Sequence, residues 1–328
     1  MGAMIPLSVL DLAPIAQGAT AADALHNARD LARHAERWGY RRFWMAEHHS
    51  MPGIASAATS VALAYVGEGT STIRIGAGGI MLPNHAPLQI AEQFGTLESL
   101  YPGRVDLGLG RAPGTDQAAA YALRRNLNAD VNQFPNDVVE LMAYLKPEQP
   151  NRVRAIPGEG LDIPIWILGS SLFGAQLAAH LGLPYAFASH FAPDQLMEAL
   201  SVYRESFRPS TQLSQPYVML GYNAFAADTD EEAALLATSM MQAFVNLRFA
   251  TPGQLLPPVE GYYESLPPPQ RRLIDHVLAC SAIGGPETVK ARMEAFVAET
   301  GADELMITAQ IYDHARRLRS FEIVAASL

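Results

Sequence analysis

Apolar and polar positions alternate along the chain in a way that predicts short buried strands separated by amphipathic helices. The first expected strand covers residues 5–12, and a helical pattern follows at about 21–38. Further strands are expected at 41–48, 72–82, 104–110, 163–169, 185–189, 216–227 and 304–308. Eight strands in order with helices between them favour a closed parallel (β/α)8 TIM barrel over an open doubly wound sheet, within the α/β class.

One segment breaks this rhythm. Residues 250–272 are crowded with prolines and glycines and come after the seventh strand and its helix. A further helix, with its start signalled at Gly285 and Pro286, and an eighth strand are still needed to close the barrel. We therefore expect an insertion or lid after strand 7 and a single domain over residues 1–328, with no domain boundary at the insertion.

Composition narrows the class of function. The 328 residues are 49% hydrophobic and 17% charged, enough to bury a large core. A net charge of −10 opposes a broad grip on nucleic acid or on an anionic membrane, so a small-molecule substrate is expected. The single cysteine, Cys280, excludes an intramolecular disulfide and a cysteine-based zinc site. No apolar stretch reaches the roughly 20 residues that span a bilayer, and the start lacks a signal peptide. These features predict a cytoplasmic protein.

The first candidate chemistry is the stretch WMAEHHSMPG, which places Glu47, His48 and His49 where the second strand ends. Neighbouring residues of a strand point to opposite sides, so the three could share one metal ion only if the strand bends there. The spacing also lacks the His-x-His or His-x-x-x-His pattern that puts two imidazoles on one face. Metal binding is the weaker interpretation. Acid/base catalysis and simple hydrogen bonding at a strand end both remain open.

A second candidate is the glycine pair Gly78-Gly79 inside the third strand. Glycine normally weakens a strand and often marks a bulge or the close approach of a ligand. A flat ring could lie against such a backbone. The same pair could equally serve only to ease the packing of the barrel.

The third candidate is an anion site formed by two neighbouring strand ends. Arg111 follows the fourth strand among Gly108, Gly110 and Gly114, and a guanidinium beside exposed amides suits a phosphate. Ser170 and Ser171 follow the fifth strand and immediately precede a helix, whose first amides also attract an anion. Serine at this place is also an ordinary N-cap. Taken together, the two segments indicate a phosphorylated cofactor held between these strand ends.

These motifs resemble the bacterial luciferase-like flavin monooxygenases. The resemblance is carried, in order, by AEHH, GAGGIMLPNHAPLQIAEQ, YPGRVDLGLGRAPG, ILGSSLFGAQLAAHLGLP and the GGPETV helix start, and it extends over essentially the whole chain. Within the family it most resembles the small single-chain group of luciferase-like monooxygenases. The family implies a (β/α)8 barrel with an insertion after strand 7, usually dimeric, that uses reduced FMN and dioxygen.

The resemblance also assigns roles to residues of this chain. It implies FMN phosphate contacts at Arg111, Ser170, Ser171 and Gly174, and a cis peptide under the flavin ring at Gly78-Gly79. The catalytic histidine of the family corresponds to His48. Glu47 and His49 would then orient the strand end.

The implied reaction is the oxidation of a small apolar organic substrate through a flavin C4a-hydroperoxide, with reduced FMN supplied by a separate NAD(P)H:flavin reductase. Such an intermediate requires exclusion of water, for which we expect Trp44, Met81, Phe191 and the proline-rich insertion. His48 would act as general base or hydrogen-bond donor. His85 and His190 are second candidates, although a cap or surface role fits each of them better.

Alternatives on the same barrel also remain. They are an oxidoreductase that uses the deazaflavin F420, a non-catalytic flavin-binding protein and a metal-dependent hydrolase.

Overall fold

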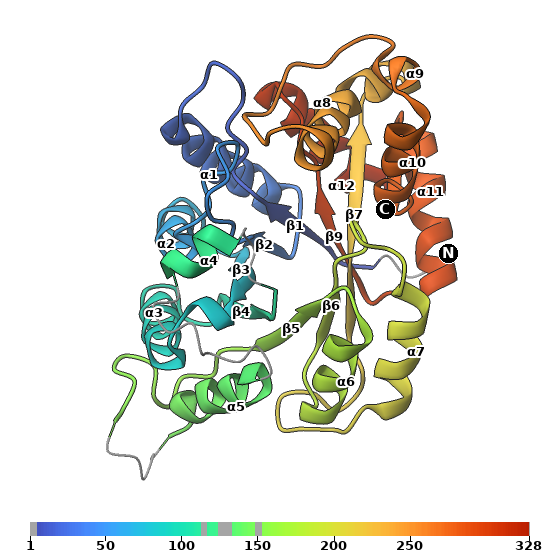
Figure 1. Ribbon diagram of the computed structural model, residues 1–328. Helices are drawn as coiled ribbons and strands as arrows, with labels where there is room; N and C mark the ends of the chain where they lie inside the picture. The colour runs from blue at the N-terminus through green and yellow to red at the C-terminus, as the bar shows by residue number, and fades with distance from the viewer. Residues whose placement is uncertain (1–4, 113–116, 124–132, 148–152, 328) are drawn as a thin grey trace.

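The computed structural model describes residues 5–112, 117–123, 133–147 and 153–327 (Figure 1). The strands are β1 (Leu7–Asp11), β2 (Arg42–Met45), β3 (Arg74–Met81), β4 (Val105–Gly110), β5 (Ile165–Gly169), β6 (Tyr185–Phe187), β7 (Val218–Ala226), β8 (Ser281–Gly284) and β9 (Glu304–Thr308). The helices are α1 (Ala21–Arg37), α2 (Thr59–Glu68), the short 3-10 helix η1 (Leu82–Asn84), α3 (Pro87–Leu100), α4 (Gln117–Leu123), α5 (Phe134–Leu145), α6 (Leu172–Leu181), α7 (Leu196–Ser206), α8 (Asp230–Phe249), α9 (Tyr262–Ser265), α10 (Pro268–Val277), α11 (Pro286–Thr300) and α12 (His314–Ser327). None of the described helices is long and apolar enough to cross a membrane.

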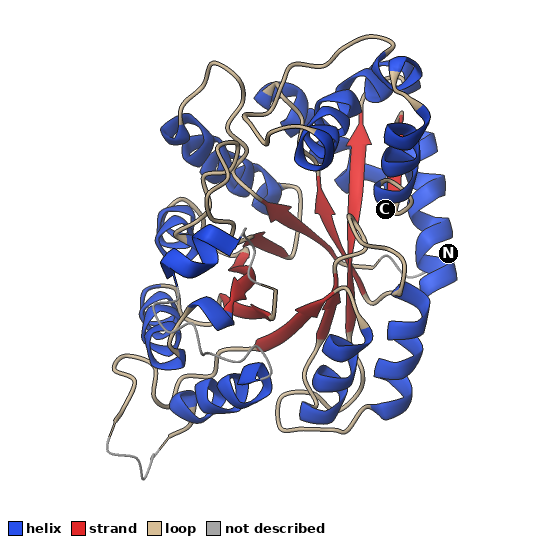
Figure 2. Cartoon of the chain, in the orientation of Figure 1, coloured by secondary structure: helices blue, strands red, loops and turns tan. Residues whose placement is uncertain are grey.

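Eight of the strands close into a parallel barrel. Strands β1 to β6 pair in chain order, β6 pairs with β7, β7 with β9, and β9 with β1. The strands form the centre of the molecule and the helices surround them (Figure 2). This arrangement confirms the predicted (β/α)8 TIM barrel with an insertion after strand 7.

Strand β8 was not predicted from the sequence. It pairs with only the last four residues of β7, Asn223 to Ala226, while Met219 to Asn223 pair with β9. At nine residues, β7 is long enough to pair with β9 in the barrel wall and with β8 beyond it. The four-residue stretch Ser281–Gly284 runs directly into Gly285 and Pro286, so its pattern alone resembles the approach to a helix.

The helix ends follow the local sequence. Thr20 caps α1, and its hydroxyl accepts a hydrogen bond from the backbone amide of Asp23, whose carboxylate bonds back to Thr20. Gly182 and Gly301 end α6 and α11 in the left-handed conformation, which glycine adopts without steric cost. These caps fix where each helix gives way to the next strand.

A network of charged side chains closes the amino-terminal end of the barrel. Arg42 donates to Glu304 Oε1 (2.9 Å) and to Asp106 Oδ2 (2.7 Å), and all three residues are buried. Above this floor the indole rings of Trp44 and Trp166 meet edge to face, with centroids 5.2 Å apart, inside a cluster of apolar side chains. A buried ion pair of this kind is kept only when its hydrogen bonds are satisfied. The inside of the barrel is therefore packed at this end, and chemistry is expected at the opposite end, where the strands terminate.

The insertion expected at 250–272 contains α9 and the first residues of α10, which lie beside α8 (Figure 1). Its first residues contact the loop after β1: the Leu255 amide donates to the Ile15 carbonyl (2.9 Å), and the Gln17 amide donates to the Leu255 carbonyl (2.8 Å). This part of the insertion reaches the loops at the carboxyl ends of the strands. The remainder packs on α8, where Val259 N donates to Thr238 Oγ1 (2.9 Å).

Candidate active site

The alternation of β2 directs His48 toward the inside of the barrel. Trp44 points inward and donates to Asp106, whereas Met45 belongs to the outer core between barrel and helices. Ala46 packs with Trp44 in the interior cluster, so the alternation continues past the end of the strand. His48 is the next residue on the inward side, and Glu47 is on the outward side.

Glu47 is the centre of a hydrogen-bond cluster at this strand end. Its Oε1 lies 2.7 Å from His49 Nε2 and 2.9 Å from His85 Nε2, and its Oε2 accepts from the Met81 amide (2.9 Å). Burial alone raises the pKa of Glu47, but the hydrogen bonds from His85, His49 and Met81 outweigh it and hold the pKa below its usual value. The carboxylate therefore stays ionised and joins the loops that follow β2 and β3.

The same three side chains are a possible ligand set for a metal ion. One atom from each of Glu47, His49 and His85 lies within 4.8 Å of the other two. The set differs from the one weighed in the sequence, because His85 replaces His48 in it. The observed separations of 2.7 and 2.9 Å are those of hydrogen bonds, and they satisfy the carboxylate without an ion.

The glycine pair lies at an irregularity of β3. The peptide bond between Gly78 and Gly79 is cis, as the family resemblance implies, and the pairing of β3 with β4 shifts register between Ala77 and Ile80. A Cβ on Gly79 would lie 2.8 Å from the carbonyl oxygen of Gly108. Packing therefore requires glycine here whatever the ligand, and the two interpretations of the sequence are compatible.

The structure brings together the residues predicted to hold a phosphate. Gly110 pairs with Leu168, so Arg111 and Ser170 leave neighbouring strands at the same edge. The Arg111 guanidinium lies 4.1 Å from the ring centroid of Phe173, in the first turn of α6. Gly114 lies outside the described residues.

The first turn of α6 has no side-chain cap, which leaves its donors open to a ligand. Ser171 is the N-cap residue, but its side chain makes no capping hydrogen bond. The first amides of a helix have no partner within the helix. Gly174 is buried, and a Cβ there would lie 3.3 Å from the Tyr185 ring. Hydroxyl, amide and guanidinium donors thus meet at one place.

The residues expected to exclude water have mixed positions. Trp44 does not line the barrel mouth: it is only 1% exposed and donates to Asp106 (3.2 Å), close to the floor of the barrel. The expectation that Trp44 lines the barrel mouth is therefore wrong, because the register of β2 turns this side chain toward the barrel axis. Met81 is half-buried at the end of β3, and Phe191 is exposed after β6.

His190 lies close enough to His48 for the two side chains to interact, which the sequence analysis did not predict. Burial and the charge of His48 lower the pKa of His190 to about 4, so the two imidazoles interact across the strand ends. Asn223, which the sequence analysis did not single out, is fully buried on β7 and donates to the His190 carbonyl (2.6 Å). The feature of the sequence that could have indicated Asn223 is the presence of an asparagine within an apolar strand.

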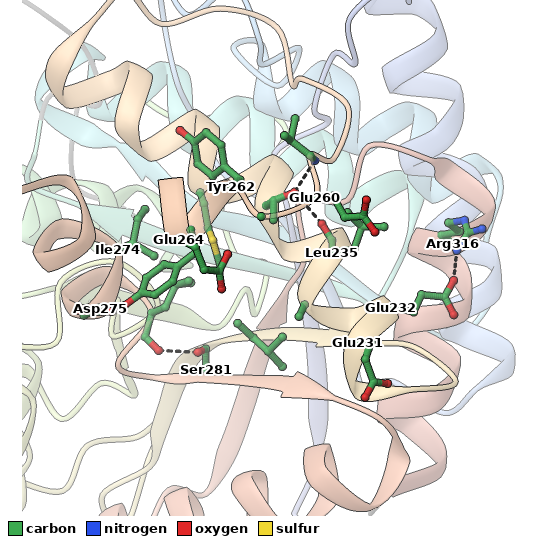
Figure 3. Close-up of a pocket in the computed structure, with 18 of the residues that line it drawn as sticks. Glu231, Glu232, Leu235, Glu260, Tyr262, Glu264, Ile274, Asp275, Ser281 and Arg316 are labelled. Carbon is green, nitrogen blue, oxygen red and sulfur yellow. Dashed lines mark hydrogen bonds and ion pairs between the residues drawn. The ribbon is translucent and has the colours of Figure 1, made fainter. Parts of the chain in front are cut away.

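A pocket of about 870 Å³ lies elsewhere, between α8, the insertion, α10 and β8 (Figure 3). Several acidic side chains line it, among them Glu231, Glu260 and Asp275, and Glu232 forms an ion pair with Arg316. None of the predicted site residues borders this pocket. Its acidic lining is unsuited to a phosphate, so we place the candidate site at the barrel mouth.

Comparisons with known proteins agree with the fold. The family model described as "Luciferase-like monooxygenase" matches residues 5–304. A protein of Escherichia coli (strain K12) named luciferase-like monooxygenase is 52% identical over 320 residues, covering 97% of this chain and 96% of that protein. The N-acetyl-S-alkylcysteine monooxygenase of Bacillus subtilis (strain 168) is 38% identical over 237 residues, covering 70% of each.

Among solved structures, the crystal structure of apo-MsnO8 has a TM-score of 0.89 and 32% sequence identity, covering 99% of this chain and 98% of that one. The likeness spans the barrel and the insertion alike. On the family match and these relatives, the chain belongs to the luciferase-like monooxygenase family.

Proposed function

We propose that this protein is a monooxygenase that uses reduced FMN and dioxygen to oxidise a small apolar organic substrate. Family membership supports an oxidoreductase with monooxygenase relatives. The choice of FMN rests on the site itself. When bound, reduced FMN would supply the electrons that activate dioxygen.

The observation that carries the proposal is the meeting of Arg111 with the first turn of α6. The guanidinium stacks on Phe173 and so stands beside Ser170 and Ser171, whose helix start has no side-chain cap. Arginine, serine hydroxyls and helix amides are the donors that bind a phosphate monoester. These residues fit the phosphate end of FMN, with Gly174 keeping the helix close to Tyr185.

The remaining residues of the proposed site occupy the strand ends on one side of that phosphate site. Gly78 and Gly79 lie on β3, adjacent to β4, and present backbone without side chains. His48 follows β2, which is the next strand again. A flavin ring extending from the phosphate site across β3 would lie beside the His48 imidazole.

We assign His48 the role of general base or hydrogen-bond donor toward the substrate. An imidazole can change protonation state near neutral pH, which suits this role. Glu47 holds the neighbouring His49 and the Met81 amide, and so fixes the backbone on both sides of the site. Met81, Phe191 and the first residues of the insertion would limit the entry of water.

Two partners follow from the same proposal. A separate NAD(P)H:flavin reductase would supply the reduced FMN, as the family resemblance implies. We also infer a homodimer in the cytoplasm from the family resemblance. Light scattering of the purified protein tests the dimer.

The deciding experiment mixes the protein with photoreduced FMN in air-saturated buffer and follows oxygen uptake, flavin absorbance and product formation. Thioethers related to the substrate named for the Bacillus subtilis relative are the first panel to test. Oxygen incorporation into a product above the free-flavin rate supports the proposal. Anaerobic turnover with the reduced deazaflavin F420 would replace it with a dehydrogenase, and oxygen consumption at the free-flavin rate over a broad panel would favour a non-catalytic flavin-binding protein.

A further inference from the structure

His190 is held against the inner face of β7 by its neighbours. It lies in the turn that follows β6, where the Ser189 hydroxyl donates to the Gly221 carbonyl (2.6 Å). The side-chain amide of Asn223 donates to the carbonyl of His190 itself (2.6 Å). The backbone on which the imidazole stands is therefore fixed to β7 at two points, and Phe191 supports the ring edge to face at 4.9 Å.

The orientation of the imidazole follows from its contact with Gly221. A Cβ built on Gly221 would lie 2.1 Å from His190 Nδ1, and 3.0 and 3.1 Å from Cε1 and Cγ. Cε1 and Cγ are the two ring carbons bonded to Nδ1, and they lie at nearly equal distances from this Cβ position. The line from Nδ1 to the Cβ position therefore follows the in-plane lone pair of Nδ1. The Cα–H group of Gly221 thus faces Nδ1, which is buried and has no hydrogen-bond partner among the described residues.

This contact selects one tautomer. A hydrogen on Nδ1 would point into the Cα–H group of Gly221 and would find no acceptor. The neutral ring therefore carries its hydrogen on Nε2, at the opposite edge of the imidazole. Within the described part of the chain Nε2 makes no hydrogen bond, and unlike Nδ1 it is not fully buried. Its N–H is open to a ligand in the barrel mouth.

The charge state agrees with this geometry. Burial lowers the pKa of His190 to about 4, with a smaller contribution from the neighbouring charge of His48. At neutral pH the ring is uncharged. Unlike His48 in its assigned role, it would not exchange protons during turnover.

We propose that His190 is a fixed, neutral Nε2–H donor that binds an oxygen acceptor of the organic substrate, in the simplest case a carbonyl group. The inference rests on the proposed function for the identity of the ligand. The proposed cofactor positions belong to β3, β4 and β5, whereas His190 and Gly221 belong to the wall formed by β6 and β7. The substrate, lying opposite the flavin ring, would have His48 on one side and His190 on the other.

A neutral donor has a specific chemical advantage here. It orients an uncharged carbonyl oxygen without supplying a proton, and it does not attract a carboxylate as an imidazolium would. A site built around such a donor discriminates strongly against analogues that lack the acceptor. His190 would therefore determine specificity.

The tautomer is tested directly by nitrogen NMR of protein labelled at histidine, in the FMN-bound state, between pH 5 and 8. We expect the His190 ring to show a bare Nδ1 and a protonated Nε2 throughout. The exposed His180, at the end of α6, provides the reference signal. A His190 resonance that titrates near pH 6.5, or a protonated Nδ1, overturns the proposal whether or not the protein oxidises anything.

Ligand binding is tested with cyclohexanone and with methylidenecyclohexane, which has the same shape but no oxygen acceptor. We expect cyclohexanone to shift the His190 Nε2–H resonance and its comparator to leave it in place. An Nε2–H resonance that cyclohexanone does not move overturns the proposed ligand.

Substitutions separate the donor from the shape of the ring. His190→Gln places an amide N–H near the position of Nε2 and should keep the dissociation constant for cyclohexanone within about threefold of the wild-type value. His190→Phe keeps a flat ring but removes the donor and should weaken cyclohexanone binding about 10-fold or more. Both variants should bind FMN like the wild type. The control His180→Phe should change neither the dissociation constant for cyclohexanone nor that for FMN.

Gly221→Ala tests the locking contact while leaving His190 in place. Its Cβ would occupy the space at Nδ1 and displace the ring, so cyclohexanone binding should fall as in His190→Phe. Thermal unfolding confirms that each variant is folded. Equal cyclohexanone binding by His190→Phe and the wild type would contradict the assignment, and loss of FMN binding in His190→Phe would transfer the donor from the substrate to the cofactor.

Discussion

The guanidinium of Arg111 lies 4.1 Å from the ring centroid of Phe173. The two residues belong to different β/α units and are brought together because β4 and β5 are neighbours in the barrel. The contact holds a positive charge over the start of α6, although Arg111 itself is exposed. Stacking on an aromatic ring is a property of arginine that lysine does not share to the same degree.

Replacing Arg111 with glutamine should weaken FMN binding by about 10- to 100-fold, because a charge-assisted hydrogen bond contributes roughly 1.5–3 kcal/mol. Quenching of flavin fluorescence measures the dissociation constant. Arg33→Gln, at an exposed position on α1, is the matched control and should leave it unchanged. Wild-type affinity in Arg111→Gln would remove the phosphate site from this strand end.

Replacing His48 with alanine should leave FMN binding intact and lower the rate of substrate oxidation by about 100-fold or more, the usual contribution of a positioned acid or base. The ratio of product formed to oxygen consumed is the sensitive measurement, since lost proton handling need not stop flavin oxidation. Intact FMN binding together with an unchanged oxidation rate would show that the catalytic assignment is wrong.

Replacing Glu47 with glutamine should lower the free energy of unfolding at pH 7 by about 1–3 kcal/mol, because the partly buried partners of this buried carboxylate lose a charged acceptor. The folded-state pKa of Glu47 lies below its ordinary value of 4.5, so its contribution is present above that value and is lost as pH falls through the folded pKa. Denaturant titrations at pH 7 and at progressively lower pH should show the wild type and the variant converging in acid. A difference independent of pH would mean that packing, and not charge, is responsible.

Treating the protein with a strong chelator should leave its melting temperature unchanged. The Glu47 carboxylate is satisfied by His49, His85 and the Met81 amide without an ion. A fall in melting temperature that zinc restores, and that Glu47→Gln abolishes, would instead establish a metal centre there.

Replacing Gly79 with alanine should destabilise the barrel by about 1–3 kcal/mol, the usual cost of overpacking, since the new Cβ would press on the Gly108 carbonyl. Gly253→Ala is the control, because a Cβ there meets nothing within 4 Å. Thermal and denaturant unfolding of the two variants decide the matter. Equal stability would leave the proposed flavin as the reason for glycine at this position.

The barrel could be predicted from the sequence because each of its strands is buried and bounded by turn residues. Strand β8 could not, since its four residues pair only with the end of β7. The arrangement of the residues at the strand ends could be predicted in part, because the order of the strands places Arg111 beside Ser170 once a barrel is assumed. The contact of His190 with Gly221 was not accessible, because it depends on the register of β6 against β7 and on the turn between them.

The floor formed by Arg42, Asp106 and Glu304 also limits the route by which a small molecule can enter the barrel. Because the interior is packed beneath Trp44, no molecule can pass along the barrel axis, and a site at the carboxyl ends of the strands is reached from that end alone. Under the proposed function, substrate and product would use the same opening. An oxidised product would therefore have to leave before the next substrate binds, and a bulky product would slow turnover.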